Sequence, residues 1–372
     1  MHAITLDAQP APKRDVVHKP TRWSHRLELA AAILLIFGFA AFAIRQLPTP
    51  SSAPVTSFPA VVQTDDATPE AADSTVPMNR GNPGRTGQMP GPGPSGEPTT
   101  RWHISTGGPI ESAVAVVGGS VVIGSKDGTL YALDAGSGDA RWTFATGSPV
   151  DGSPSIVDGV VYVGTQNGTI FAVDFTTGTK LWEFAGAREG TSPLVVDGTV
   201  YVGSWDDNSL YALDAKSGAQ RWTFAAAAPF IRIGAYAGGV VYYPSREGVL
   251  HAIDATTGIE RWSFTMDTPV DVDSPVVLDG VVYQPTYQSG SMLYAIDAAT
   301  GAERWRYSKP QGFRAPAVDA ETVYLPGTDG NIYALDRQDG AERWIATIPG
   351  PLAAPPSLSD GVLYVGGQDA TL

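Results

Sequence analysis

Few residues in this chain have the types and spacing that catalysis requires. The 372 residues include no cysteine, which excludes disulfides, thiolate zinc sites, cysteine nucleophiles and a lipid-modified cysteine. Only His103 and His251 lie outside the N-terminal region, so no histidine cluster is available for a metal. No Ser-His-Asp order, Walker loop or dinucleotide fingerprint is present, and Asp271-Val-Asp273 is too short for a calcium loop. We therefore expect no catalytic residue and no metal site.

Binding chemistry is better represented, by two aromatic residues and a set of spaced charges. Trp205 lies in Ser204-Trp205-Asp206-Asp207-Asn208, and Tyr287 lies in a segment from Gln284 to Ser291. Exposed aromatic residues on loops are plausible interface anchors, so both are candidate partner-binding residues. Alternatively, their rings cover a neighbouring repeat. The spaced charges recur about every 40 residues, at Glu111, Asp151, Glu189, Arg232, Asp273 and Arg314, with Arg188 and Asp271 beside two of them.

A repeat of about 40 residues positions these side chains. Its core is Tyr131–Trp142, YALDAGSGDARW, which returns in five later copies. The closing tryptophans, with one more upstream, are Trp102, Trp142, Trp182, Trp222, Trp262, Trp305 and Trp344. The repeat aspartates are Asp134, Asp174, Asp214, Asp254, Asp297 and Asp336. A fixed period of this length with alternating apolar residues is typical of a β-propeller, with one blade per repeat.

The residue types of the repeat have structural explanations. The aspartate ends a half-buried strand, and its carboxylate can accept hydrogen bonds from the N–H groups of the next turn. The following glycine, such as Gly138, supplies a positive φ in that turn. The tryptophan then begins the outer strand and packs between blades. We therefore expect these residues to build blades rather than to carry chemistry.

Blade one provides a template of four strands. They are expected at Glu111–Val117, Ser120–Gly124, Thr129–Asp134 and Arg141–Phe144. The seventh unit has only an inner strand near Ala353–Leu358 and a second strand from Gly361. Because Trp102 is a fourth strand without a blade of its own, we expect it to complete the last blade and close the ring. The alternative is a truncated reading frame.

In a propeller, the residues that precede the inner strands lie at the mouth of the central channel. The spaced charges from Glu111 to Arg314 are therefore candidates for ligand or cofactor binding, because loops on a rigid scaffold commonly carry function. The alternative is that they are solvated charges at a wet opening, where charge costs little.

The repeat resembles the PQQ-binding-like β-propeller family, whose signature is A-x-D-x-x-T/N-G-x-x-x-W. Blade one matches it at Ala132, Asp134, Gly138 and Trp142, and Met78-Asn-Arg-Gly-Asn-Pro-Gly-Arg-Thr-Gly resembles the lead-in of such propellers. The family includes quinoprotein dehydrogenases, the assembly propeller BamB and sensor domains of kinases. A quinoprotein would bind PQQ with Ca²⁺ and is typically much longer. Together, the repeats and the shared last blade predict an all-β fold, a seven-bladed β-propeller of four-stranded blades.

Composition and charge indicate an exported domain. Residues 1–26 carry five basic residues against two acidic ones and predict a cytoplasmic tail. Residues 27–45 contain the apolar run Leu29–Ile44, which the positive-inside rule orients as a transmembrane anchor. Ala41-Phe42-Ala43 also fits a cleaved signal peptide. Residues 46–78 are a Pro- and Ser-rich linker, and residues 79–372 form the propeller.

Three functions are consistent with this organisation. Residues 45–372 carry 19 basic and 35 acidic residues, which excludes electrostatic binding of nucleic acid. We expect a membrane-anchored, extracytoplasmic, non-catalytic scaffold that binds envelope or cell-surface proteins. The alternatives are a PQQ-binding oxidoreductase and an extracellular ligand-sensing domain.

Overall fold

The computed structural model describes part of one of the two units into which the chain divides. These units are residues 1–60 and 61–372, and the second holds every described residue. The described residues are 76, 78–90, 100–187, 192–230, 232–267, 272–287, 290–348, 350, 352, 354–359 and 361–366. The expected tail and anchor, and the linker except Val76 and Met78, lie outside them, as do Arg188, Glu189 and Asp271. No helix in these ranges is long and apolar enough to cross a membrane.

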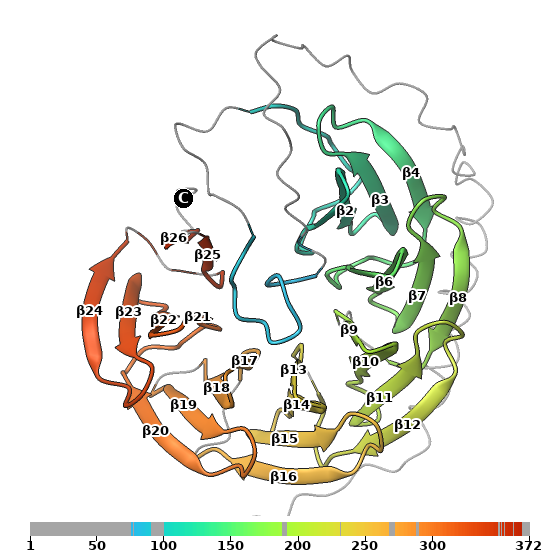
Figure 1. The fold of residues 1–372 in the computed structure, drawn as a ribbon. Helices are drawn as coiled ribbons and strands as arrows, with labels where there is room; N and C mark the ends of the chain where they lie inside the picture. Colours follow the sequence, from blue (N-terminus) through green and yellow to red (C-terminus); the bar gives the residue numbers. More distant parts are fainter. Residues whose placement is uncertain are drawn as a thin grey trace, which may run out of the picture. The chain divides into compact units, whose positions relative to one another are not determined.

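Within residues 61–372, six four-stranded antiparallel sheets follow one another in chain order, each with its strands in sequence (Figure 1). The inner strands are β1 (Ala115–Val117), β5 (Ser155–Val157), β9 (Leu194–Val196), β13 (Ala235–Ala237), β17 (Val276–Leu278) and β21 (Ala317–Val318). The second strands are β2 (Ser120–Gly124), β6 (Val160–Gly164), β10 (Thr199–Gly203), β14 (Val240–Pro244), β18 (Val281–Pro285) and β22 (Thr322–Pro326).

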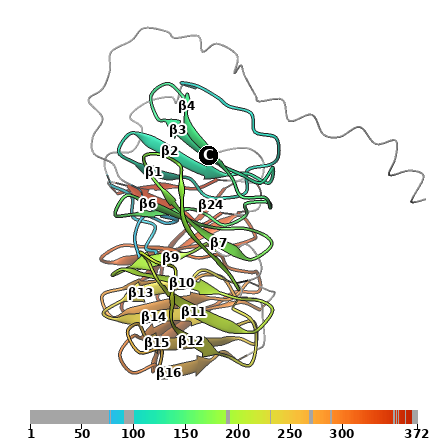
Figure 2. The same ribbon diagram turned by 90° about the vertical axis from the view of Figure 1, so that its right-hand side faces the viewer.

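The outer half of each sheet is built from two longer strands. The third strands are β3 (Thr129–Asp134), β7 (Thr169–Asp174), β11 (Ser209–Asp214), β15 (Val249–Asp254), β19 (Met292–Asp297) and β23 (Asn331–Asp336). The fourth strands are β4 (Ala140–Ala145), β8 (Lys180–Ala185), β12 (Gln220–Ala225), β16 (Glu260–Thr265), β20 (Glu303–Ser308) and β24 (Glu342–Thr347). Figure 2 shows the sheets from the side. The expectation of an all-β fold with four-stranded blades is confirmed.

The second and third strands of blade one have the bounds that the repeat predicts, but the inner strand is shorter. It begins at Ala115 and not at Glu111. The Ser112 hydroxyl bonds both the N–H and the carbonyl of Gly124 at 3.0 Å, so a side chain replaces strand pairing there.

The seventh sheet has two described strands, β25 (Ser357–Ser359) and β26 (Val362–Tyr364). The prediction of a fourth strand around Trp102 is wrong, because residues 100–106 belong to no described sheet. A fourth strand needs a third strand to pair with, and the described part of this sheet has none. Trp102 nevertheless packs against blade one.

Trp102 and the next five repeat tryptophans join each blade to the next in the same way. Each indole N–H donates to the carbonyl of the residue after the next repeat aspartate, over 2.8–3.1 Å. In blades two to four, the hydroxyl of a tyrosine on the second strand donates to the same carbonyl as the tryptophan of its blade. In blade two, for example, Tyr162 and Trp182 both donate to the carbonyl of Ala215. We call this pair of donors on one carbonyl the blade latch. It ties blades by polar contacts that burial strengthens.

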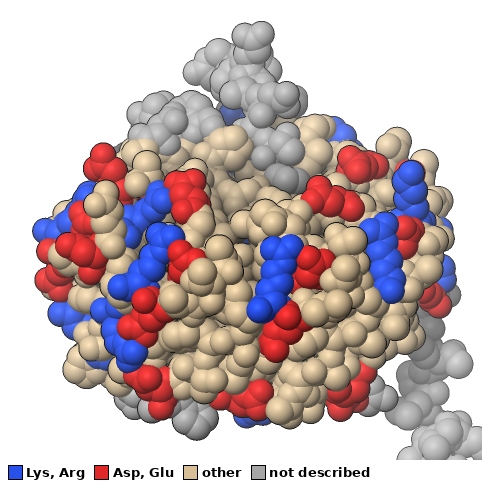
Figure 3. Space-filling view, turned by 60° about the horizontal axis from the view of Figure 1, so that its bottom comes forward, with Lys and Arg blue, Asp and Glu red and all other residues tan. Residues whose placement is uncertain are grey.

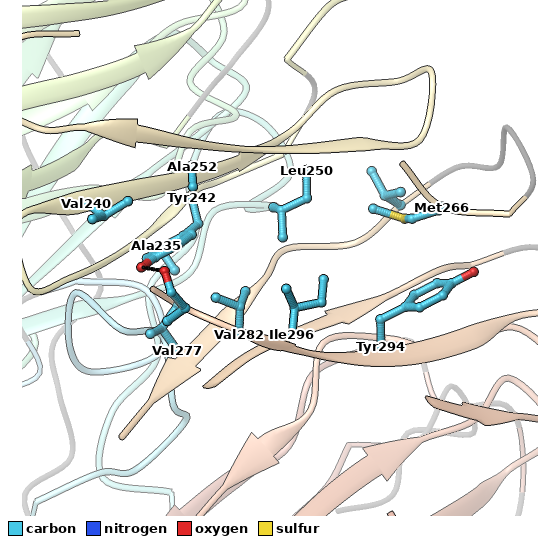
Figure 4. Close-up of a cluster of buried hydrophobic side chains, with 12 residues drawn as sticks. Ala235, Val240, Tyr242, Leu250, Ala252, Met266, Val277, Val282, Tyr294 and Ile296 are labelled. Atoms are coloured by element: carbon cyan, nitrogen blue, oxygen red, sulfur yellow. Dashed lines mark hydrogen bonds between the residues drawn. The ribbon is translucent and has the colours of Figure 1, made fainter. Parts of the chain in front are cut away.

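Apolar side chains fill the space between neighbouring blades. One cluster joins blade four to blade five and includes Leu250, Met266, Val282, Tyr294 and Ile296, all at most 4% exposed (Figure 4). Burying one aliphatic side chain of this size stabilises a fold by about 1.5–3 kcal/mol. Packing between blades therefore stabilises the fold, and the blade latch adds hydrogen bonds at the same interfaces.

The contact between a repeat glycine and the tryptophan of the preceding blade can be tested at Gly258. This residue has a φ of 73° and lies under the Trp222 ring. A Cβ there would lie 2.7 Å from the indole. We expect Gly258→Ala to destabilise by about 2–4 kcal/mol, from backbone strain and overpacking. Gly280 is a matched control, since its φ is 74° and a Cβ would meet nothing within 4 Å. Gly280→Ala should cost about 1–2 kcal/mol. Equal losses in denaturant unfolding would contradict the tryptophan contact.

Candidate functional site

The segment from Val76 to Pro90, here the lead-in segment, runs along the inner strands at the centre of the sheets (Figure 1). Val76 exchanges two backbone hydrogen bonds with Val116 of β1. Carbonyls of the segment accept hydrogen bonds from inner-strand amides of four further blades: Pro83 from Tyr236, Gly84 from Val277, Thr86 from Val318 and Gly87 from Leu358, over 2.8–3.0 Å. Five inner edges are thereby paired with a single segment.

Local turns allow the lead-in segment to follow this path. The Asn82 side chain bonds the backbone N–H and the hydroxyl of Thr86, and the Arg85 N–H bonds the Asn82 carbonyl at 3.0 Å. Arg80 and Arg85 adopt positive φ values of 65° and 58°. Such values are rare for non-glycine residues. The surrounding contacts therefore hold the segment in a bent path that presents its carbonyls outward.

Two buried arginines belong to this segment. Arg85 is 1% exposed and donates to the Asn79 carbonyl at 2.6 Å, and Arg80 is 8% exposed and donates to the Pro316 carbonyl. Burial lowers the pKa of Arg80 to about 9, with Asp273 partly offsetting the effect, and lowers the pKa of Arg85 to about 10. Both guanidinium groups remain charged at neutral pH. Sequence reasoning missed them, although two arginines in a glycine-rich lead-in were a usable signal.

The charges that precede the inner strands make contacts within and between blades. Glu111 pairs with Lys126 at 2.8 Å, and Arg314 lies 3.7 Å from Asp273. Arg232 donates to the Val272 carbonyl of the next blade at 2.8 Å. Asp151 has a buried oxygen without a hydrogen-bond partner, and Glu189 is outside the described residues. Among the described residues, no three His, Cys, Asp or Glu side chains gather to hold a metal.

Trp205 and Tyr287 each stack against an arginine of the next blade. The Arg246 guanidinium lies 4.7 Å from the Trp205 ring centroid, and that of Arg314 lies 3.7 Å from the Tyr287 ring centroid. Cation–π contacts of this kind contribute about 0.5–2 kcal/mol. Both aromatic rings are half-buried. Each ring therefore contacts a neighbouring blade and still presents part of its surface to solvent.

The outer rim carries a repeated ion pair. An arginine of the fourth strand bonds the repeat aspartate in five blades, at Arg141–Asp134, Arg221–Asp214, Arg261–Asp254, Arg304–Asp297 and Arg343–Asp336. Figure 3 shows blue and red side chains adjoining on one face. These arginine bonds, with turn N–H groups, lower the pKa of Asp134 and Asp297 to about 2. Blade two differs, because Leu181 replaces the arginine.

The chain belongs to the family described as outer membrane protein assembly factor BamB, whose model matches residues 95–229 and 206–372. The resemblance inferred from the repeat is thereby confirmed. No curated protein matches the chain.

Solved structures share this fold. BamB from Moraxella catarrhalis is 25% identical, with a TM-score of 0.63 over 72% of this chain and 86% of that one. The computationally designed Ika8 protein is 20% identical, with a TM-score of 0.63 over 70% and 81%. The quinohemoprotein alcohol dehydrogenase ADHIIG from Pseudomonas putida HK5 is 16% identical, with a TM-score of 0.59 over 69% and 62%. The last two likenesses concern the fold alone.

The lead-in contact is testable at Gly84, where a Cβ would lie 2.6 Å from the Val277 carbonyl oxygen. Backbone atoms cannot move aside cheaply, so we expect Gly84→Ala to destabilise by about 1–3 kcal/mol in denaturant unfolding. Gly366→Ala is the control, because nothing lies within 4 Å of a Cβ there. A Gly84→Ala chain as stable as the control would contradict the role of the segment.

The arginine–aspartate ion pairs of the outer rim predict that the stability of the fold depends on pH. Since the folded pKa of Asp134 and Asp297 is about 2 and the unfolded value is about 3.9, their stabilisation is present above pH 4 and is lost as pH falls toward 2. Leu181→Arg should add a sixth pair with Asp174 and stabilise by up to about 1 kcal/mol at pH 7 but not at pH 2. Leu181→Gln is the uncharged control. The measurement is the melting temperature between pH 7 and 2; a gain independent of pH would refute the pairing.

Proposed function

We propose that this chain is a membrane-anchored, extracytoplasmic, non-catalytic scaffold that binds other proteins through loops at the mouth of its propeller. The observation that carries the proposal is the pair of aromatic–arginine stacks at Trp205 and Tyr287. Half-buried aromatic side chains that an arginine of the neighbouring blade holds in place can serve as anchors with little loss of conformational entropy on binding. Membership of the BamB family supports this class of function.

The proposal also includes an N-terminal membrane anchor and a closed, seven-bladed ring. The apolar run within residues 27–45 supports an N-terminus in the cytoplasm and a propeller outside the cell membrane. The packing of Trp102 on Gly138, which matches that of Trp142 on Gly178, supports a seven-bladed ring with Trp102 at the fourth-strand position of the last blade. Envelope or cell-surface proteins are then the partners within reach.

The residues present do not fit the quinone alternative. PQQ with Ca²⁺ needs several oxygen ligands and a carboxylate base in one pocket. The described acids that precede the inner strands, Glu111, Asp151 and Asp273, instead occur in three different blades, and Glu111 and Asp273 face cations. The lead-in segment also lies along the inner strands at the centre. The proposed function therefore includes no quinone chemistry.

Calorimetric titration of the full chain with PQQ and Ca²⁺ should give no saturable heat. Among the described residues no three His, Cys, Asp or Glu side chains gather to hold Ca²⁺, so we expect only heats of dilution. A titration with Ca²⁺ alone separates weak ion binding from quinone binding. Saturable heat that requires both components would contradict a purely non-catalytic scaffold and favour the oxidoreductase alternative.

The partner site is tested by site-specific photo-cross-linking in the native cell envelope, with the photoreactive residue at Asp206, beside Trp205. Trp205→Ala and Tyr287→Ala together should reduce a defined adduct at least tenfold, since a central aromatic anchor is worth about 2 kcal/mol or more. Ile259→Ser is the control, because Ile259 is 67% exposed in blade four outside the mouth loops. Unchanged capture, with melting temperatures preserved, would reject this site.

A further inference from the structure

The two arginines of the lead-in segment have more hydrogen-bond donors than their surroundings accept. Arg80 and Arg85 are the only buried Lys, Arg, Asp or Glu side chains in the described part of the chain. Each donates from one guanidinium nitrogen to a backbone carbonyl, that of Pro316 for Arg80 and that of Asn79 for Arg85. Nε and Nη1 of Arg80, and Nε and Nη2 of Arg85, are closed off from solvent and have no hydrogen-bond partner among the described residues. Because a guanidinium group only donates, these four nitrogens require an acceptor.

No described carboxylate forms an ion pair with either arginine, since none lies within 4.0 Å of their guanidinium nitrogens. The nearby acid Asp273 is engaged elsewhere. Its Oδ1 accepts from the Ser274 N–H at 2.7 Å, and its Oδ2 lies 3.7 Å from Nη1 of Arg314. One carboxylate therefore accompanies three arginines, and the described side chains leave a net positive charge at the centre. Buried charge without a counterion is strongly unfavourable.

Other neighbouring groups do not offset this charge. Burial lowers the pKa of Arg80, Asp273 partly offsets the effect, and the charge of Arg85 lowers that pKa further, so the two guanidinium groups are close enough to repel each other. Tyr243 lies near Arg85, but burial raises the pKa of Tyr243, and its phenol stays neutral at neutral pH. The Tyr243 hydroxyl donates to the Tyr201 carbonyl at 3.2 Å. The missing partner must therefore supply both acceptors and negative charge.

We propose that Arg80 and Arg85 hold a small inorganic anion at the centre of the propeller. An anion accepts hydrogen bonds and offsets the repulsion between the two arginines, whereas a buried water molecule carries no charge and adds donors of its own. The four nitrogens are enclosed by protein atoms, so the occupant must be small, and slight movement of the two long side chains must accompany binding. The site is distinct from the loops that carry Trp205 and Tyr287.

The anion would have a structural role through the lead-in segment. The carbonyls of this segment accept hydrogen bonds from the inner strands of blades four to seven, and both arginines belong to it (Figure 1). A ligand that binds the folded chain alone stabilises the fold in proportion to the logarithm of its concentration. We therefore expect the stability of the propeller to depend on the identity of the anion in solution and not only on ionic strength.

Crystals of the full chain in detergent, grown in sodium bromide, test the site without any substitution. Bromide scatters anomalously and replaces chloride. We expect an anomalous peak within hydrogen-bonding distance of guanidinium nitrogens of Arg80 and Arg85. Crystals grown in sodium phosphate without halide form the second arm, in which tetrahedral density at the same place would assign the site to an oxyanion. Water alone in both crystals, or a carboxylate of the same chain at these nitrogens, would overturn the proposal.

Thermal unfolding in solution tests the same arginines. At constant ionic strength, replacing gluconate, which is too bulky for the site, with chloride should raise the melting temperature saturably by roughly 2–5 °C. Arg80→Met and Arg85→Met remove the charge and keep an apolar side chain of similar length, and each should lose at least half of this rise. Arg101→Met is the matched control, because Arg101 is exposed and should keep the full rise.

An equal rise in all three variants would overturn the proposal, because chloride would then act on the surface of the protein. Phosphate in place of chloride separates the two kinds of anion, with the same variants as controls for its general stabilising effect. Trp205→Ala and Tyr287→Ala should keep the full anion response, so failure of the anion site is distinguishable from failure of the proposed scaffold.

Discussion

Backbone groups on the inner strands impose the constraint on which this fold depends. Each described blade ends at the centre in a short strand whose inner edge has no further strand of its own sheet. Buried N–H and C=O groups without partners cost about as much as lost hydrogen bonds. The lead-in segment meets this requirement in five blades at once. In blades one to three, serine hydroxyls assist, with Ser153 accepting from Ala113 and Ser192 accepting from Ser153.

The contacts at the centre of the propeller therefore differ in kind from those at its rim. At the rim, the tryptophan hydrogen bond repeats from Trp102 to Trp305, and the complete blade latch recurs in blades two to four. At the centre, one non-repeating segment pairs with the inner strands of five blades, each through different residues. The loops that carry Trp205 and Tyr287 differ from those of the other blades, and each ring stacks on an arginine of the next blade. Function in such a fold is a property of its irregular parts.

The sequence predicted the regular parts well, because local periodicity determines them. The bounds of β2 and β3 follow directly from alternation and the glycine turns. The sequence overestimated the length of the inner strand β1, because the Ser112 hydroxyl bonds Gly124 where a backbone group of that strand was expected. The lead-in path, the burial of Arg80 and Arg85, and the arginine stacked on each aromatic residue depend on contacts distant in sequence. No spacing rule reports such contacts, and the resemblance of the stretch from Met78 to the lead-in of such propellers indicated neither its path nor its partners.

Native-state hydrogen exchange tests the central claim most directly, because it measures the backbone pairing of single residues. The amides of Tyr236, Val277, Val318 and Leu358 each donate to a lead-in carbonyl. In the intact chain they should exchange as slowly as amides of the third strands, whose opening requires global unfolding. Exchange of these amides at the rate of exposed loops, while the third strands stay protected, would contradict the account.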